Sequence, residues 1–323
     1  MTHLKNRLGD SGLNVSRIGI GLNNLGRKNS FTETQSGSSE VVHAAIANGI
    51  NFLDVADVYN NGIAEEFLGN ALVGKRHEVI LATKFGMDAR GLNGPDFSAR
   101  GSRKYIIQAI EASLKRLKTD YIDLYQYHTP DAATPIEETL RALDDLITSG
   151  KVRYIGHSNH AGWQIAKAHY VAHELGTHHF ISAQNHYNLL DRRAELEVLP
   201  AAQEFGLGVL PYFPLANGLL TGKYRRDFAP EQGRITHSKP DLLKTANWEQ
   251  LEAFANFAEN RGKQPFEVAL SWLAAQEPVA SVIAGATTVA QVEANAAAIF
   301  ELTPGELAEL TEIFPAPARI ALF

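Results

Sequence analysis

The chain has 323 residues, of which 45% are hydrophobic and 20% charged, and its formal net charge is -6. This ordinary composition excludes a disordered chain, and the negative charge argues against a general affinity for nucleic acid or anionic lipid. The absence of cysteine excludes disulfides, thiolate nucleophiles and zinc-thiolate sites. No signal-like segment opens the sequence and no apolar run approaches the ~20 residues of a membrane span, so we expect a cytoplasmic protein.

Short apolar runs alternate with stretches of helical periodicity along the chain. Residues 5–17 predict a hairpin, and eight strand-like runs follow, each succeeded by a helical pattern. The expected strands are 18–21, 51–54, 79–84, 122–128, 154–157, 180–184, 208–212 and 282–283. The helices expected after them are 39–48, 64–73, 103–117, 135–149, 162–175, 195–205, 248–260 and 289–299.

Alternation of this kind indicates a parallel sheet covered by helices, and eight units favour closure into a barrel over an open sheet. We therefore expect an α/β fold in which residues 1–323 form a single domain, a (β/α)8 TIM barrel with an N-terminal β-hairpin. Two extra C-terminal helices, 266–276 and 304–312, are expected outside the repeat. The tail after Phe314 is expected to be an irregular arm that either packs across a barrel mouth or lies on the surface.

Titratable residues stand at the ends of three neighbouring expected strands. Asp54 ends the second run, with Tyr59 in the loop behind it, while Lys84 ends the third run and His128 the fourth. Barrel enzymes carry their reactive groups at the carboxyl ends of the strands, so we expect these four side chains to face one mouth. Each residue alone fits a structural role at least as well, and only their convergence indicates a catalytic site.

These four residue types suit proton transfer to a carbonyl group. The ammonium of Lys84 favours the phenolate and so lowers the pKa of Tyr59, while Asp54 keeps Lys84 charged and in position. His128 can orient a substrate carbonyl, and Tyr59 can then donate its proton to the carbonyl oxygen as hydride reaches the carbon. No side chain supplies hydride, so this chemistry requires a nicotinamide cofactor.

From about Leu8 to Phe314 the chain resembles the aldo-keto reductase family, of the bacterial type related to potassium-channel β subunits. The resemblance rests on ordered motifs in 49–59, 82–84, 120–128 and 152–159, which contain the four residues above. It implies a (β/α)8 barrel, carbonyl reduction with NADP(H), and Tyr59 as the general acid. Relatives that clamp the 2′-phosphate often carry Lys or Arg in the stretch matching 283–291, where this chain has neither, so NAD(H) stays open.

The resemblance also implies a set of cofactor-binding positions, to which Asp54 belongs as well. Ser158, Asn159 and Gln184 match the residues that hold the nicotinamide carboxamide, and Tyr212 matches the aromatic residue that stacks on the nicotinamide ring. The other positions are Gly21 and Leu22 after the first strand, Phe213, Pro214, Leu215, Gly218, Leu220 and Lys223 in the pyrophosphate loop, and Gly285, Thr287, Gln291 and Asn295 at the adenosine end.

Three classes of function stay open from the sequence. The first is a reductase acting on aldehydes, ketones or sugars, with oxidation of a sugar or alcohol as the alternative physiological direction. The second is a barrel aldolase that uses Lys84 as a Schiff base, which would have no use for the cofactor positions. The third is a nucleotide-sensing partner subunit, which the lack of a long basic or heptad-bearing extension disfavours.

A small carbonyl compound or a sugar is the expected ligand. Four polar residues near the mouth favour a hydroxylated substrate, and four apolar or aromatic residues are candidate walls of the pocket. The polar residues are Asn24, Arg27, Asp57 and Asn60, and the candidate walls are Phe31, Met87, Phe97 and Tyr127. No nucleic acid, membrane or metal ion is expected as a partner, the histidine-rich stretch 157–179 included, and the oligomeric state stays open.

Overall fold

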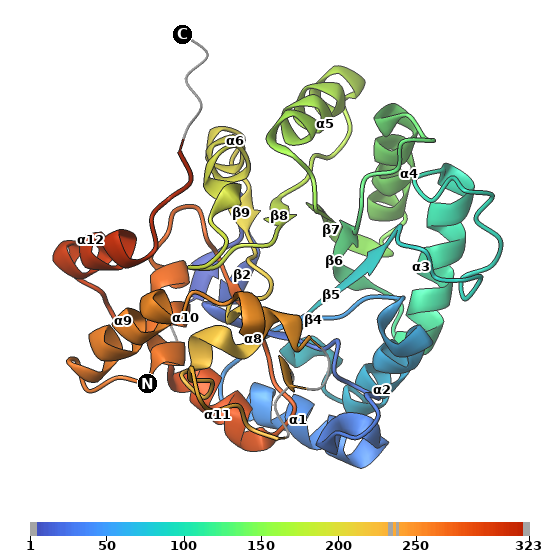
Figure 1. Cartoon of the computed structure of the whole chain (residues 1–323). Coiled ribbons are helices and arrows are strands. Elements are labelled where there is room, and N and C mark those ends of the chain that lie inside the picture. Colours follow the sequence, from blue (N-terminus) through green and yellow to red (C-terminus); the bar gives the residue numbers. More distant parts are fainter. Residues whose placement is uncertain (1–4, 232–234, 237–238, 319–323) are drawn as a thin grey trace, which may run out of the picture.

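The computed structural model describes residues 5–231, 235–236 and 239–318 (Figure 1). Its strands form a two-stranded antiparallel hairpin and an eight-stranded parallel sheet. The hairpin consists of β1 (Lys5–Arg7) and β2 (Asn14–Ser16). The barrel strands are β3 (Ile18–Gly21), β4 (Phe52–Asp54), β5 (Ile80–Phe85), β6 (Ile122–Tyr127), β7 (Val152–Ser158), β8 (Ser182–Gln184), β9 (Gly208–Val209) and β10 (Val282–Gly285).

The eight-stranded sheet closes on itself. Its strands pair in the order β10-β3-β4-β5-β6-β7-β8-β9. Across the remaining gap, the Val209 amide donates to the Pro278 carbonyl and the Ala280 amide donates to the Val209 carbonyl, each at 2.9 Å. The Ile283 amide then donates to the Pro211 carbonyl at 3.0 Å. These bonds join the segment around β9 to the segment leading into β10, and the predicted (β/α)8 barrel with its N-terminal hairpin is confirmed.

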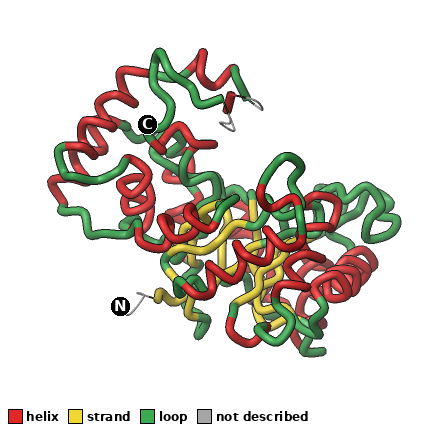
Figure 2. The backbone as a smooth tube through the Cα atoms, turned by 90° about the horizontal axis from the view of Figure 1, so that it is seen from below, coloured by secondary structure: helices red, strands yellow, loops and turns green. Residues whose placement is uncertain are grey.

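Helices surround the barrel strands in Figure 1, and in Figure 2 the barrel strands, in yellow, lie among the helices. The surrounding helices are α1 (Gln35–Ala47), α2 (Ile63–Ala71), α3 (Arg103–Leu117), α4 (Ile136–Thr148), α5 (Gly162–Leu175), α6 (Val198–Glu204), α10 (Pro265–Ala274) and α11 (Val289–Ala297). Further helices are α8 (Asp241–Thr245), α9 (Trp248–Glu259) and α12 (Pro304–Ile313). Short 3-10 turns are η1 (Phe31–Glu33), η2 (Tyr59–Gly62), η3 (Arg76–Glu78), η4 (Arg193–Glu195) and η5 (Ala216–Thr221).

One helix assignment differs from the expectation. The sequence pattern paired the seventh barrel strand with 248–260 and left 266–276 outside the repeat. In the structure α10 contacts β10 and buries six consecutive residues from Val268 to Leu273, whereas α9 packs against α10 and α12. The helix that covers this part of the barrel is therefore α10, and α9 is the addition.

The barrel interior has an apolar half and a polar half. Side chains alternate along a strand, so residues two apart share a face. Phe52, Ala82 and Leu124 point inward and form a buried cluster with Leu8 and Val15 of the hairpin. The residues two positions further along β4, β5 and β6 are polar. The hairpin therefore closes the amino-terminal end of the barrel, and the polar residues lie toward the carboxyl-terminal mouth.

Some predicted segments lie partly outside the described residues. The arm after Phe314 is irregular over residues 315–318, and the rest of it, 319–323, lies outside them. The long loop 224–240 is described except for 232–234 and 237–238. Within the described ranges, no helix combines the length and the apolar character needed to cross a membrane.

Candidate active site

Four side chains meet at the carboxyl ends of β4, β5 and β6. The Lys84 ammonium donates to Asp54 Oδ2 at 2.6 Å, to the Val55 carbonyl at 3.0 Å and to the Tyr59 hydroxyl at 3.4 Å. The Tyr59 and His128 rings lie edge to face, with centroids 6.0 Å apart. The structure thus brings together all four residues that the strand ends indicated.

Local structure aims these side chains. Alternation along β5 turns Lys84 into the barrel, where it is fully buried, while the preceding Thr83 points outward and donates to Glu65 at 2.6 Å. Tyr59 opens η2, whose next residue, Asn60, has a left-handed φ of 48°. The Asn60 amide donates to the Leu25 carbonyl at 2.5 Å. Because asparagine adopts this conformation more readily than most residues, the turn holds Tyr59 over the mouth.

Gln126 belongs to the site, although the sequence reasoning did not single it out. Its amide donates to Asp54 Oδ1 at 2.9 Å, and the Gln184 amide donates to the same oxygen at 3.0 Å. With the bond from Lys84, Asp54 accepts three side-chain hydrogen bonds and is held rigidly. A signal for Gln126 was present, because it lies two residues before His128 on the same predicted strand and so shares its face.

The buried pair fixes the charge state of the lysine. Burial favours the neutral amine of Lys84, but the Asp54 carboxylate and Tyr59 outweigh it, and the pKa of Lys84 lies above its ordinary value. The amine is therefore protonated at neutral pH. A Schiff base forms from a neutral amine, so this environment argues against the aldolase alternative.

The pKa of Tyr59 departs from the expectation. Burial is the largest effect and raises the Tyr59 pKa, Lys84 opposes it, and Asp54 adds to it, so that the pKa lies above its ordinary value. Lys84 lowers the pKa of Tyr59, as expected. The expected net lowering of this pKa is nevertheless wrong, because burial disfavours the phenolate more than one ammonium favours it. Tyr59 therefore holds its proton at neutral pH, as a proton donor must.

His128 is electrically neutral in this site. Burial, followed by the charge of Lys84, lowers the pKa of His128 well below its usual range. Its Nδ1 is buried without a hydrogen-bond partner among the described residues, and its backbone carbonyl accepts from the Asn159 amide at 3.0 Å. A neutral imidazole with its proton on Nε2 can donate one hydrogen bond into the mouth.

The predicted nicotinamide-binding residues form one connected group. The Ser158 hydroxyl donates to the Gln184 carbonyl at 2.7 Å, and the Asn159 amide donates to the Ser158 hydroxyl at 3.2 Å. The Tyr212 hydroxyl donates to Asn159 Oδ1 at 2.8 Å, and its ring stacks on His186 with centroids 5.5 Å apart. Because the Gln184 amide nitrogen already serves Asp54, its oxygen is the atom suited to a carboxamide N–H. His186 was not anticipated.

The loop after β3 adjoins this group. Gly21 pairs in register with Asp54 on one side and with Gly285 on the other. The Leu22 amide donates to the Asp54 carbonyl at 2.8 Å, and its side chain is buried. Both residues therefore lie at the rim beside Asp54.

The predicted pyrophosphate loop has an unusual backbone. Phe213, Ala216, Asn217 and Gly218 all have positive φ values, and at Gly218 φ is 114°. A Cβ added at Gly218 would lie 3.2 Å from Tyr224 and 3.3 Å from Lys223 Cε, so this position is crowded, and its φ also favours glycine. Of the other predicted residues here, Lys223 is exposed, Leu215 is half-buried, and two are buried, namely Pro214 and Leu220.

The predicted adenosine-binding residues lie around the start of α11. The Thr288 hydroxyl caps the helix by accepting a hydrogen bond from the backbone amide of Gln291 at 3.3 Å. The Thr287 amide and hydroxyl both donate to Gln291 Oε1, at 2.8 and 3.1 Å. The Asn295 amide donates to the Gly285 carbonyl at 3.4 Å. These four predicted residues are thus brought together, at the rim where β10 meets β3.

Two residues expected at the substrate side are not available there. Asp57 is fully buried and is held by Asn93 at 2.7 Å. Tyr127 is also buried, where it stacks on Phe85 and its hydroxyl accepts from the Asp131 amide. These expectations were wrong because position near a strand end does not say whether a side chain turns into the mouth or away from it.

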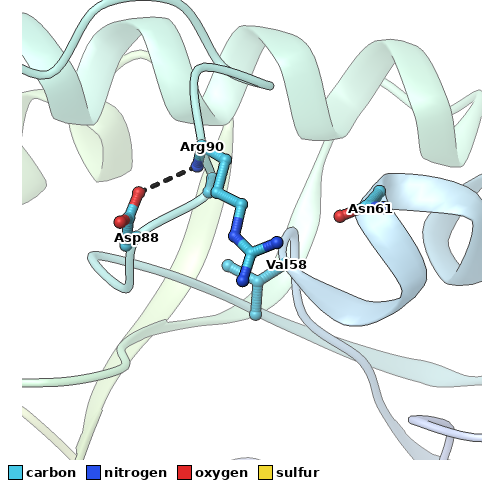
Figure 3. A pocket seen from close by; sticks show the side chains of 5 residues that line it. Val58, Asn61, Asp88 and Arg90 are labelled. Carbon is cyan, nitrogen blue, oxygen red and sulfur yellow. Dashed lines mark hydrogen bonds between the residues drawn. The ribbon is translucent and has the colours of Figure 1, made fainter.

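A polar pocket borders the segment that carries Tyr59 (Figure 3). Its cavity volume is about 230 Å³, and it is lined by Val58, Asn61, Asp88, Ala89 and Arg90. Val58 directly precedes Tyr59, Asn61 lies two residues after it in η2, and the other three residues follow Lys84 and β5. The Asp88 carboxylate accepts from the Arg90 amide at 2.9 Å, which shapes this wall.

The histidine-rich stretch is a packing feature. The rings of His157 and His160 lie 4.4 Å apart, and those of His169 and His179 lie 6.0 Å apart. In the part of the chain that the structure describes, no group of three or more His, Cys, Asp or Glu residues is arranged to hold a metal ion.

Comparison with known proteins places this site in a family. The model of the aldo/keto reductase family matches residues 17–314. An uncharacterized oxidoreductase of Bacillus subtilis (strain 168) is 38% identical, covering 96% of this chain and 95% of its own. L-glyceraldehyde 3-phosphate reductase of Escherichia coli O157:H7 is 35% identical over 94% and 90% of the two chains. A probable voltage-gated potassium channel subunit beta of Arabidopsis thaliana is 34% identical over 90% of each. The chain belongs to the aldo/keto reductase family.

Proposed function

We propose that the protein reduces a small aldehyde or ketone to the alcohol with NADPH, and that Tyr59 donates the proton. As an aldo/keto reductase it is an oxidoreductase of carbonyl compounds with a nicotinamide cofactor. The observation that carries the finer proposal is the buried contact from Asp54 through Lys84 to the Tyr59 hydroxyl, beside His128.

The residues at the mouth fit a nicotinamide cofactor. The oxygen of Gln184, with Ser158 and Asn159, offers hydrogen-bond partners to a carboxamide. Tyr212 has His186 against one face of its ring, which leaves its other face for a flat heterocycle. Lys223, an exposed cation whose side chain lies beside Gly218, suits the charge of the pyrophosphate. When bound, the cofactor supplies a hydride to the carbonyl carbon.

The chain itself moves the proton. His128 donates a hydrogen bond to the substrate carbonyl oxygen and orients it toward Tyr59. The Tyr59 hydroxyl gives its proton to that oxygen as the carbon gains the hydride, so the product is an alcohol and the tyrosine becomes a phenolate. The Lys84 ammonium stabilises the phenolate, which regains a proton from water. The same groups run the oxidation of an alcohol in reverse.

Substitution of the tyrosine tests this proposal. Turnover is followed by loss of reduced-nicotinamide absorbance, with NADPH and NADH in parallel. Tyr59→Phe is expected to lower kcat by about 10²–10⁴-fold, because general-acid catalysis contributes that much. NADPH binding, measured by fluorescence titration, is expected to persist. Tyr170→Phe, at an exposed tyrosine on α5, serves as the matched control and should retain full activity. Unchanged turnover in Tyr59→Phe would exclude the mechanism.

Polar lining near Tyr59 favours a small hydroxylated substrate. Asn61, Asp88 and Arg90 offer hydrogen bonds on one wall of the pocket. The relative that reduces L-glyceraldehyde 3-phosphate acts on such a compound, as its name states. Short hydroxyaldehydes and sugars therefore belong first in the substrate panel, with flat apolar ketones as the comparison. A clear preference for the apolar ketones would contradict this assignment.

The cofactor preference rests on α11. Phosphate binds well at a helix amino terminus, where free backbone amides and the helix dipole favour an anion. The Thr288 cap and Thr287 stand at this terminus, without a lysine or arginine in 283–291. The missing cation counts against a 2′-phosphate, so the helix terminus alone supports NADPH as the preferred cofactor, with a modest advantage over NADH. A higher kcat/KM with NADH would overturn the assignment.

A further inference from the structure

A cluster of buried polar residues lies behind the catalytic mouth, between the barrel and its outer helices. Asp57, Glu65 and Asn93 are each at most 6% exposed. They come from the loop after β4, from α2 and from the long loop after β5, and Arg116 reaches them from α3. The mechanism above uses none of them, and burying such groups is costly unless they are paired.

One continuous set of contacts connects the cluster. The Asn93 amide donates to Asp57 Oδ2 at 2.7 Å, and Arg116 Nη2 donates to Asn93 Oδ1 at 2.9 Å. Arg116 Nε donates to Glu65 Oε2 at 2.7 Å, and the Thr83 hydroxyl donates to Glu65 Oε1 at 2.6 Å. The set begins at Asp57, two residues before Tyr59, and ends at Thr83, one residue before Lys84. It therefore runs between the chain segments that carry the proton donor and its lysine.

The charges in this cluster do not balance. Two carboxylates share one guanidinium, and Arg116 bonds Glu65 directly but reaches Asp57 only through Asn93. The second oxygen of Asp57 is buried with no hydrogen-bond partner among the described residues. Besides a backbone contact with Val58, the Asp57 carboxylate depends on the Asn93 amide, which gives it a side-chain hydrogen bond.

The surroundings of Asp57 bring its pKa close to neutral pH. The titratable groups that act on it or feel its charge are Glu65 on α2, Arg116 and Tyr105 on α3, Tyr125 on β6, and Tyr59 in η2. Its backbone amide also contacts the carbonyl of Lys84 on β5. Burial, followed by the charge of Glu65, raises the pKa of Asp57 to about 7.

We propose that Asp57 and Asn93 are positioning residues for the proton donor: their buried hydrogen bond fixes the segment 55–59 to the loop 88–102. The loop carries Asp88 and Arg90, which line the pocket, while the segment carries Tyr59. The bond therefore holds the pocket wall and the donor at a fixed separation. This inference rests on the proposed function, since that defines Tyr59 as the donor.

Three substitutions test the pair. Asn93→Ala removes the bond and is expected to lower kcat by about 10- to 100-fold, since small displacements of reacting groups cost that much. NADPH affinity should stay unchanged, because the cofactor positions lie elsewhere on the mouth. Gln108→Ala is the matched control: Gln108 holds the same loop through the Asn93 and Pro95 carbonyls but does not touch Asp57. Asp57→Asn keeps the acceptor and removes the charge.

The charge of Asp57 gives a readout that a purely structural role would not move. An ionised Asp57 raises the pKa of Tyr59. In Asp57→Asn the fall of the reduction rate on the alkaline side should therefore begin at lower pH than in the wild type, while kcat near pH 6 stays close to it. An unchanged profile would remove the electrostatic part of the proposal.

An exchange of the two groups guards against variants that fold poorly. Asn93→Asp alone places two carboxylates face to face and should lose activity. Adding Asp57→Asn exchanges the amide and the carboxylate across the same contact, with the carboxylate now beside Arg116, and is expected to restore most of the lost kcat. Failure of this double variant to recover turnover would contradict a specific role for the contact.

Hydrogen exchange separates this inference from the proposed function. Without any substrate, peptides covering residues 55–62 should exchange faster in Asn93→Ala than in the wild type, but not in Gln108→Ala. If the wild type reduces no carbonyl compound, the proposed function fails while this exchange result still decides about the contact. Equal exchange in the two variants, or equal losses of kcat, would overturn the inference.

Discussion

The ion pair between Asp54 and Lys84 lies inside the barrel, with the two side chains 3% and 0% exposed. Because the pair is buried, keeping both charges costs little stability, whereas removing only one of them costs a great deal. The two charges together are tolerated because each has hydrogen-bond partners, whereas one charge left alone has no water to solvate it. We therefore expect stability to depend on this contact, and in the proposed mechanism activity depends on it as well.

Removing the lysine tests that asymmetry. Lys84→Met leaves the Asp54 carboxylate buried without its cation, and we expect the free energy of unfolding to fall by about 3–5 kcal/mol. Adding Asp54→Asn should return part of the loss, although activity stays absent. Lys75→Met breaks an exposed pair with Glu78 and should cost less than about 1 kcal/mol in the same urea titrations. Equal losses at the two lysines would refute the argument.

Asp57 predicts a pH dependence of stability. Its pKa is about 7 in the folded protein and about 3.9 in an unfolded chain, so between these values the folded state binds more protons. The stabilisation that results from this raised pKa is therefore fully present at low pH, and it is lost as the pH rises toward 7. Relative to the wild type, Asp57→Asn should gain stability between pH 5 and pH 9, on the order of 2–4 kcal/mol. A difference that stays constant with pH in urea titrations would contradict this.

At single residues, the strand-end rule predicted the convergence of Asp54, Lys84 and His128 from sequence. The separate expectation that Asp57 serves the substrate side was wrong, because a loop residue has no alternating pattern that tells its direction. The net pKa of Tyr59 was also beyond the sequence, since it depends on how deeply the phenol is buried, which several separate segments decide. The same alternation places Gln126 on the face that carries His128, although the prediction from sequence did not include it.

At the level of elements, apolar runs bounded by turn residues located all eight barrel strands and the hairpin. The sequence pattern assigned α9 to the barrel where the structure has α10, and this difference shows the limit of that approach. Both helices have an apolar face, so periodicity alone does not say which one covers the sheet. The choice depends on α12, a distant segment that packs against α9.

The hairpin under the barrel gives a prediction at this scale. Leu8 is fully buried against the apolar half of the interior, so Leu8→Ala should lower the free energy of unfolding by about 2–5 kcal/mol. Leu13→Ala, at a partly buried leucine of the same hairpin, should cost clearly less. Because the hairpin lies at the end opposite the mouth, KM for cofactor and substrate should not change. A raised KM in Leu8→Ala would show that the two ends are coupled.

Across the whole molecule, the predicted cofactor positions come from distant parts of the chain, from Gly21 to Asn295. A ligand that contacts all of them bridges the strands on which the barrel closes, and it stabilises only the folded state. NADPH at 100 times its Kd should therefore add about 2.7 kcal/mol to the free energy of unfolding. Thermal denaturation should show the same gain in Tyr59→Phe, and a smaller one with NADH. No shift with either nucleotide would contradict the cofactor assignment.

Barrel closure also sets an order on events during synthesis. The strand β3 is made before the other barrel strands, and one of its two neighbours is β10, which emerges from the ribosome roughly 260 residues later. Until then one edge of β3 has unpaired backbone groups, and an exposed edge is a site where strands of other chains can add. The nascent barrel is thus an open sheet until β10 has been made, and the pairing of β10 with β3 is the step that removes this hazard.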